Sequence, residues 1–600
     1  MPLVSPRKAL VHLVTVLVMV LGAGLAQQSH VSAQSGAPGS QDRSANSTEI
    51  LRVTTRMVLV DAVVTDSLGN PVSGLKAADF EVRENGKVEQ IRAFAERSPE
   101  ILQRESAPSA SPYKMPPGLF TNITDFHPEY GPLTILLIDS LNTPYFDQPY
   151  MREALIKYLQ GIGSRHNLMI FTLGRRLGLI QNLNSDPQLL QEALKRIASD
   201  SSLKKASRPK ESSKAADSDD RAFSLAQELL GTGPMFDKER QIGRLESSLL
   251  DQFPDRAILK QDEEVRATLA SLRIISRSVA GYPGRKNLIW LSAAFPVFTY
   301  QENLGDSRNY FPEVQQTANL LADSEMAIYP VDVRGLVPNF LPDASSDIQR
   351  HGMIGGSRVT SVIAASSNAL GASHSAMDYL ATQTGGRAYY NRNDIEHGIA
   401  LSVQDGSSYY SLGYYPTDKN WDGGFRKIQI KIHNKELHVH YRRGYYATDR
   451  THLTPQRMTA AKQEFFNSMA LDAPPATGLP IVVQVFPRAK DNGPILINIG
   501  VDPHAVSFEL EGEQREAGEV EFATIVLDEK GKPVASKSNI LKTYLTPETF
   551  KKVMSGSLVV QQKFDLSPGR YLLRVGVQDL RSEQVGTTTA RVEVQPVKVE

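Results

Sequence analysis

The chain has 600 residues, too many for one hydrophobic core, so about two to four domains are expected. Basic and acidic residues balance at 66 each, which leaves no overall charge to attract nucleic acid or an acidic membrane. The absence of cysteine excludes disulfides, thiolate metal sites and cysteine nucleophiles.

Residues 1–33 predict a secretory signal peptide. Arg7 and Lys8 precede an apolar run from Ala9 to about Ala26, and small residues follow at Val31-Ser32-Ala33. This order of basic start, apolar centre and small-residue exit is typical of an export signal. The run is nearly long enough to span a bilayer, so an uncleaved membrane anchor is the alternative. We therefore expect a secreted or periplasmic protein, with a disordered tether over 34–49.

A small β module is predicted over 50–97. Apolar and β-branched runs indicate strands at 50–53, 57–66, 79–84 and 88–94, and Asn85-Gly86 is a hairpin signal. A module of this size is expected to need support from a neighbour. The stretch 98–130, rich in proline and serine, reads as a linker.

An α/β domain is predicted over 131–449. The continuous apolar run Thr134–Asp139 is typical of a parallel strand that is buried on both faces. Strands and helices then alternate, apart from a charged insertion at about 200–262 and a loop at 337–372, so we expect a doubly wound, mainly parallel sheet. Three further strands, at 409–415, 425–433 and 437–443, are expected to extend that sheet.

The C-terminal part is predicted to be all β. A linker with a short helix covers 450–479, and strand patterns recur through 480–600, near 480–487, 495–500, 519–527, 558–564, 569–578 and 588–595. Short strands separated by turn signals predict an immunoglobulin-like β-sandwich.

Several motifs, in order along residues 50–448, resemble the acidobacterial-type VWFA-related domain family. They include Ile138–Thr143, Gly284–Trp290, Ile328–Leu336 and Thr384–Ala388, together with the upstream Val64–Phe80 and the closing Tyr409–Tyr414 and Arg443–Tyr445. The resemblance implies a von Willebrand factor A fold behind a secretion signal. It implies little about activity.

Von Willebrand A domains commonly bind a divalent cation through Asp-x-Ser-x-Ser, with a Thr and an Asp from two other loops. Here Leu141 stands at the first Ser, and Ser292-Ala293-Ala294 lacks the expected Asp. The remaining candidate ligands for Mg²⁺ or Ca²⁺ are Asp139, Asn142, Thr143, Asn184 and Asp332. Alternatively, the first three cap the turn that follows the strand and bind no metal.

The sequence shows no catalytic constellation, since nucleophile elbows, phosphate loops and zinc-binding His-Glu-x-x-His are absent. We therefore expect a binding protein that contacts an unknown protein partner at the carboxyl edge of its sheet, with no nucleic-acid partner. A membrane contact is expected only through an uncleaved N-terminal segment. The alternatives are a scaffold of the cell envelope and, less favoured, a metal-dependent enzyme that acts on extracellular polymers.

Overall fold

A computed structural model gives the fold of the chain. It describes positions 101, 126, 192 and 195 and residues 57–99, 116–123, 131–144, 147–161, 167–174, 176–184, 254–295, 310–335, 356–448, 455–486, 493–511 and 515–595. The predicted signal peptide, the tether and most of the charged insertion lie outside these residues. Within them, no helix is long and apolar enough to cross a membrane.

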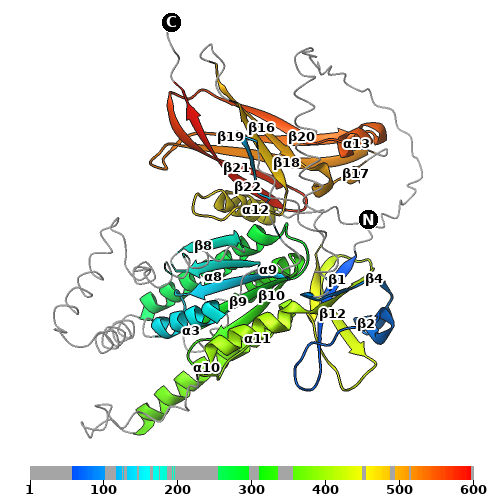
Figure 1. Cartoon of the computed structure of the whole chain (residues 1–600), viewed down its shortest axis with the longest axis vertical. Helices are drawn as coiled ribbons and strands as arrows, with labels where there is room; N and C mark the ends of the chain where they lie inside the picture. The colour runs from blue at the N-terminus through cyan, green and yellow to red at the C-terminus, as the bar shows by residue number, and fades with distance from the viewer. Residues whose placement is uncertain are drawn as a thin grey trace, which may run out of the picture.

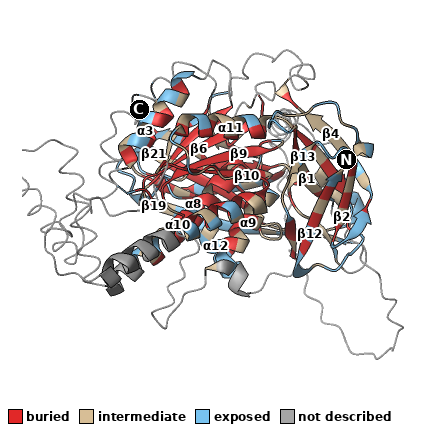
Figure 2. Cartoon of the chain, turned by 90° about the horizontal axis from the view of Figure 1, so that it is seen from below, coloured by how far each residue is buried: buried red, intermediate tan, exposed pale blue. Residues whose placement is uncertain are grey.

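A five-stranded sheet forms the centre of the α/β domain (Figure 1). Its order is β10-β9-β6-β7-β8, in which the first four strands run parallel and β8 pairs antiparallel with β7. Every residue of β6, β9 and β10 is buried, as Figure 2 shows, because helices cover both faces. The strands are β6 (Leu133–Asp139), β7 (Leu168–Leu173), β8 (Leu177–Asn184), β9 (Lys286–Ser292) and β10 (Met326–Asp332).

Two hydrophobic cores lie on the two faces of this sheet. One core joins β6 side chains such as Leu137 to three helices, α8 (Pro254–Val279), α9 (Phe311–Asp323) and α10 (Gly356–Thr384). The other joins side chains such as Leu136 to α3 (Gln148–Gly161) and α11 (Ile395–Ser407). The predicted loop at 337–372 is thus helical from Gly356 onwards, and α11 was not predicted.

The three strands expected to extend the parallel sheet belong elsewhere, so that prediction is wrong. They pair with the N-terminal strands in two antiparallel sheets, β13-β1-β11-β4 and β14-β12-β2-β3. The first sheet contains β1 (Val58–Thr65), β4 (Ile91–Arg97), β11 (Tyr409–Tyr414) and β13 (His438–His440). The second contains β2 (Phe80–Glu84), β3 (Lys87–Glu89), β12 (Asp422–Ile432) and β14 (Gly444–Thr448), with the 3₁₀ turn η1 (Ala77–Asp79) before it.

The β module is therefore discontinuous in sequence, and the α/β domain is inserted within it. Its core contains the buried carboxylate Glu84, which accepts hydrogen bonds from the hydroxyls of Tyr414 at 2.8 Å and Tyr445 at 2.9 Å and pairs with Arg426 at 3.1 Å. These donors come from strands far along the chain, which explains why two half-modules form one unit. Burial, together with the charge of Glu84, raises the pKa of both tyrosines.

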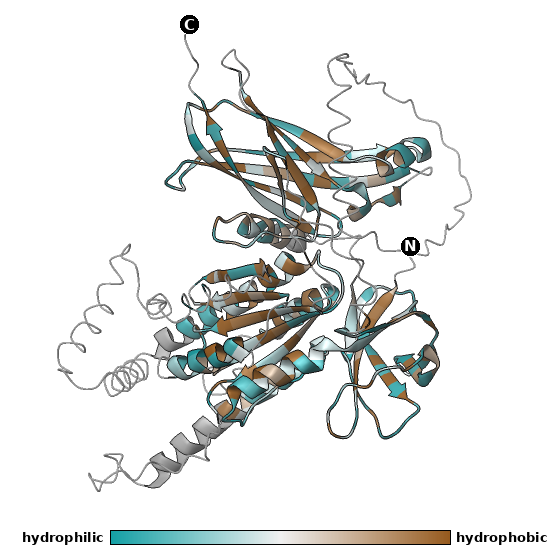
Figure 3. Ribbon diagram, in the orientation of Figure 1, coloured by the Kyte–Doolittle hydropathy of each residue, from teal (hydrophilic) through white to brown (hydrophobic). Residues whose placement is uncertain are grey.

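The C-terminal unit consists of two antiparallel sheets around one shared core (Figure 3). One sheet is ordered β20-β16-β15-β5, from β5 (Leu119–Thr121), β15 (Ile481–Phe486), β16 (Ile495–Val501) and β20 (Leu558–Phe564). The other contains β17 (Glu509–Glu511), β18 (Arg515–Leu527), β19 (Pro533–Leu545), β21 (Gly569–Asp579) and β22 (Val585–Val594), and the connections include η4 (Pro503–Ala505) and α13 (Pro547–Met554). β5 lies in the predicted linker 98–130, and β17, β19 and α13 were not predicted.

Helix α12 (Pro455–Ser468) joins this unit to the α/β domain. Its Glu464 forms ion pairs with Arg273 and Arg277 of α8. Behind it, the buried guanidinium of Arg574 donates to the carbonyl of Ser468 at 2.7 Å, and burial lowers the pKa of Arg574 to about 10. The described part of the chain is mixed α/β, as predicted, but only one of the five sheets within it is mainly parallel.

Candidate functional site

Asp139 ends the central strand β6 and is fully buried. Its Oδ1 accepts the backbone N–H of Asn142 at 2.9 Å, and its Oδ2 accepts Asn142 Nδ2 at 2.8 Å and Trp290 Nε1 at 2.9 Å. Burial raises the pKa of Asp139, although these hydrogen bonds oppose the rise. Asp139 therefore fixes the turn after β6, which agrees with the capping alternative.

The next two candidates complete the same turn. Asn142 Nδ2 also donates to Thr268 Oγ1 of α8 at 2.9 Å, and Thr143 Oγ1 accepts the backbone N–H of Ala293 at 3.1 Å. Asn142 and Thr143 are buried as well. The turn is thereby tied to α8 on one side and to the end of β9 on the other.

Asn184 does not join this group. It is the last residue of β8 and pairs with Leu168 at the start of β7, whereas Asp139 lies level with Leu173 at the end of β7. Because β8 runs antiparallel, its end reaches the amino edge of the sheet, not the carboxyl edge. The predicted placement of Asn184 beside Asp139 is therefore wrong.

Asp332 ends β10 at the carboxyl edge, level with Ser292 of β9. Both of its oxygens contact the guanidinium of Arg334, with Nη2 at 2.6 Å, and Oδ2 also lies 3.0 Å from His374 Nε2. Burial alone would raise the pKa of Asp332, but the hydrogen bonds from His374 and Arg334 outweigh it and lower that pKa. Asp332 therefore serves as the acceptor that holds these two side chains in place.

One more acidic residue belongs to this edge. Asp147 precedes α3 and is partly buried, and the charges of Arg334 and Asp332 act on its carboxyl group. Burial raises its pKa to about 6. We call Asp147, Asp332, Arg334 and His374 the carboxyl-edge cluster. Its member His374 also stacks on Tyr390, with 4.1 Å between ring centroids.

Sequence reasoning found only one of these four residues. Arg334 could have been found, because it follows Asp332 by two residues within a quoted motif. Asp147 and His374 carry no local signal, since neither belongs to a recognisable motif.

The residues at this edge do not fit a divalent cation. The oxygens of Asp139 already accept three N–H groups, and Leu141 offers no oxygen. Ser140 Oγ and Asn142 Oδ1 have no hydrogen-bond partner within the described residues, but neutral oxygens offset little of the cost of dehydrating Mg²⁺. Nor do three His, Asp or Glu side chains come together as a metal site in the described part of the chain.

The opposite, amino edge of the sheet holds a second charged group, which we call the amino-edge cluster: Arg285, Lys286, Glu325 and Asp61. Arg285 donates to Asn287 Oδ1 at 3.2 Å, to the Tyr329 hydroxyl at 3.0 Å and to the Gly385 carbonyl at 2.6 Å, and its backbone N–H donates to the Tyr409 hydroxyl of the β module at 3.0 Å.

Burial lowers the pKa of Lys286 and raises the pKa of Glu325. The opposite charges of these two side chains oppose both shifts, and the charge of Asp61 of β1 raises both pKa values. The motifs around Gly284, Gly385 and Tyr409 therefore meet where the α/β domain joins the β module. They build a joint between the two domains, in which Arg285 and Lys286 are buried.

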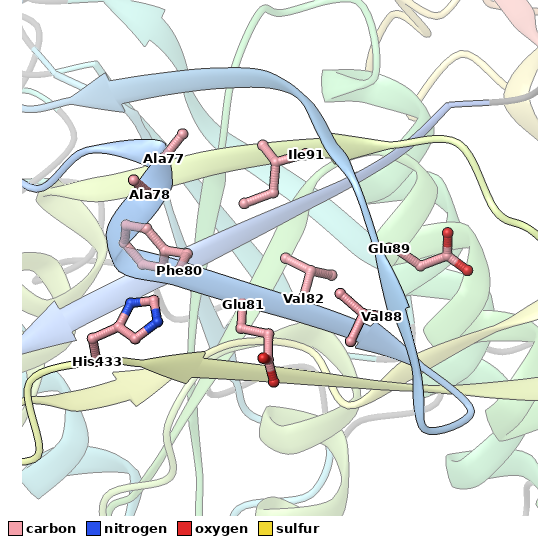
Figure 4. A pocket seen from close by; sticks show the side chains of 9 residues that line it. All are labelled: Ala77, Ala78, Phe80, Glu81, Val82, Val88, Glu89, Ile91 and His433. Atoms are coloured by element: carbon pink, nitrogen blue, oxygen red, sulfur yellow. The ribbon is translucent and has the colours of Figure 1, made fainter.

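A shallow pocket of about 380 Å³ lies in the β module, with Phe80, Val82 and Ile91 on its floor (Figure 4). Both carboxylates in its lining already have partners, since Glu81 pairs with Arg83 and Glu89 accepts hydrogen bonds from Thr417. Few polar groups remain to orient a ligand, and we assign the pocket no role.

Comparison with known proteins gives no family. No protein-family model matches the chain, and no curated protein matches it significantly. Among solved structures, an aerotolerance-related membrane protein from Bacteroides fragilis is similar over 46% of this chain and 98% of its own, at 12% identity and a TM-score of 0.24.

The human COPII-coat protein Sec24c covers 62% of this chain and 53% of its own, at 11% identity and a TM-score of 0.18. A β-glucosidase from Listeria innocua covers 56% and 39%, at 10% identity and a TM-score of 0.14. Likenesses this weak carry no argument about fold or function, so the family resemblance seen in the sequence stays a prediction.

Proposed function

We propose that this protein is an exported binding protein with a von Willebrand A-type domain, which holds a partner protein at the carboxyl edge of its five-stranded sheet. The observation that carries the proposal is the carboxyl-edge cluster, in which Asp332 positions Arg334 and His374 at the end of β10. Open α/β sheets bind ligands beyond the carboxyl ends of their strands. Export rests on the predicted signal peptide.

The proposed contact is direct and needs no metal. Arg334 and Asp147 are partly exposed and charged, and they suit a polar partner surface that offers both signs of charge. Asp139 lies beneath them as a structural residue.

The absence of cysteine makes a site-specific test simple. A cysteine replacing Tyr150, which is 42% exposed at the start of α3, would carry a benzophenone cross-linker on the full chain in native envelopes. Leu68, 85% exposed in a turn of the β module, provides the control position. We expect position 150 to cross-link a protein that position 68 does not, with or without a chelator. Unlabelled wild type should compete, and Arg334→Glu should not.

A scaffold of the cell envelope is the second candidate. It is favoured by two joints of the α/β domain: the backbone N–H of Arg285 donates to the Tyr409 hydroxyl of the β module, and Glu464 of α12 forms a partly buried ion pair with Arg277. Identical cross-links from positions 150 and 68, together with stable self-association of the full chain, would support the scaffold and contradict the binding-edge proposal.

A further inference from the structure

Strand β19 forms a long free edge of the C-terminal unit. Its 13 residues pair with β18 along one side, and no other described strand pairs with its second side. The backbone N–H and C=O groups along that side can template another strand. β20, the end strand of the facing sheet, lies beside it, because Gln562 Nε2 donates to Asn539 Oδ1 at 3.0 Å.

Large apolar side chains concentrate on this side of the unit. Val534, Ile540 and Tyr544 of β19 are 48%, 52% and 52% exposed. Ile540 and Tyr544 lie on one face of β19, and Val534 stands at an irregularity in its pairing with β18, whereas Ala535 and Leu541 pack against the core. An added strand would therefore cover apolar surface as well as backbone.

The charge on this edge selects among occupants. Lys537 and Lys563 have no acidic partner among the described residues, and the Lys537 ammonium instead donates to the Lys563 carbonyl. Lysines on an edge strand oppose pairing with a second copy, because the same cations would meet. The chain also shows which strand β19 accepts: β18 carries Glu519, paired with Lys542 at 2.7 Å, and Glu521, bonded to Ser538.

We infer that β19 is a docking site for an extended, acidic segment of a partner protein. The segment adds a strand to the sheet, places apolar side chains beside Ile540 and Tyr544, and brings carboxylates to Lys537 and Lys563. This surface is separate from the carboxyl-edge cluster, so an experiment can contradict one of the two proposals without contradicting the other.

The test measures fluorescence anisotropy of a labelled peptide that copies Glu516–Leu527, added to the full chain. This peptide is an acidic strand that already pairs with β19 in the fold. We expect saturable binding that weakens by about tenfold when its glutamates become lysines. Two further peptides carry methyl groups on alternate backbone nitrogens, one on the even-numbered and one on the odd-numbered residues. Only the peptide that lacks the N–H donors facing β19 should lose binding.

Variants of the chain locate the site. Ile540→Glu and Lys537→Glu should each weaken peptide binding by about fivefold, through lost apolar contact and reversed charge respectively. Leu510→Glu is the matched control, since Leu510 is 54% exposed on β17 of the same unit, and should leave binding unchanged.

Several results would overturn the inference: no saturable binding, equal binding of the lysine peptide, or binding that neither variant changes. Sedimentation of the full chain gives one more result that would contradict the inference. If the chain forms dimers that Ile540→Glu disrupts and Leu510→Glu does not, a second copy occupies the edge, and the acidic-segment inference is wrong.

Discussion

The two edges of the five-stranded sheet carry similar charged residues and put them to different uses. At the amino edge, Arg285 and Lys286 are almost fully buried beneath the β module, and Arg285 donates only to neighbouring groups of the protein. At the carboxyl edge, Asp332 is equally buried, but Arg334 and His374 remain partly exposed. Charge alone therefore does not show which edge is open to a partner; the burial of the charged side chains has to be compared as well.

The sharpest way to break this comparison is to remove the amino-edge guanidinium. Arg285→Met keeps much of the volume but leaves Asn287, Tyr329 and Gly385 without their donor. We expect a loss of about 3 kcal/mol in the free energy of unfolding, measured by urea denaturation. Arg83→Met is the control: Arg83 lies at the surface beside Glu81, and its loss should leave the free energy of unfolding nearly unchanged. Equal effects would mean that the amino edge is not a structural joint.

Asp139 tests whether the carboxyl edge is also closed beneath its surface. In Asp139→Asn, one amide N–H₂ must face the donors of Asn142 or Trp290, whichever way the side chain is turned. We expect a loss of about 2 kcal/mol in the free energy of unfolding. A variant as stable as wild type would contradict the structural role and return Asp139 to the candidate ligands.

The pH dependence of stability reports on Asp147, a partly exposed residue of the carboxyl edge. Burial raises the pKa of Asp147 from 3.8 to about 6, so the folded state favours its neutral form. Its contribution is fully present below the unfolded pKa and is lost as the pH rises through about 6. Asp147→Asn should therefore match wild type near pH 4 and exceed it at pH 7.5 by no more than about 1 kcal/mol, because solvent screens this partly exposed group. Equal stabilities at both pH values would show that Asp147 is fully solvated.

Local sequence patterns predicted most of the helices and strands, and they predicted how the strands of the mainly parallel sheet are arranged. The apolar runs that became β6, β9 and β10 are strands buried at every residue, and their alternation with helices indicated the mainly parallel sheet. The segments 409–415, 425–433 and 437–443 were predicted correctly as strands but were given to the wrong sheet. Their partners lie more than 300 residues earlier, and only long-range contacts such as Tyr414 with Glu84 decide the pairing.

The candidate site was predicted less completely, for related reasons. The position of Asp139 at the end of a buried strand was evident from the sequence, but its donor Trp290 comes from the adjacent strand β9. Asn184 was placed at the wrong edge because the direction of β8 was not carried through. His374 reaches Asp332 from a helix 42 residues later, a contact that only the packing of α10 creates.

Metal addition has the smallest expected effect and separates the two explanations of Asp139. A site with a Kd of about 0.1 mM would stabilise the fold by about 2.7 kcal/mol at a hundredfold excess of free ion. The carboxyl edge lacks free anionic oxygens at Asp139, so we expect 10 mM Ca²⁺ or Mg²⁺ to shift the free energy of unfolding by less than about 0.3 kcal/mol. Asp139→Asn and Asp332→Asn should respond to the ions as wild type does. If the ions instead stabilise wild type and Asp332→Asn but not Asp139→Asn, the buried carboxylate must exchange its N–H donors for a cation. The two edges would then differ in whether they bind a cation, and not only in how deeply their charged side chains are buried.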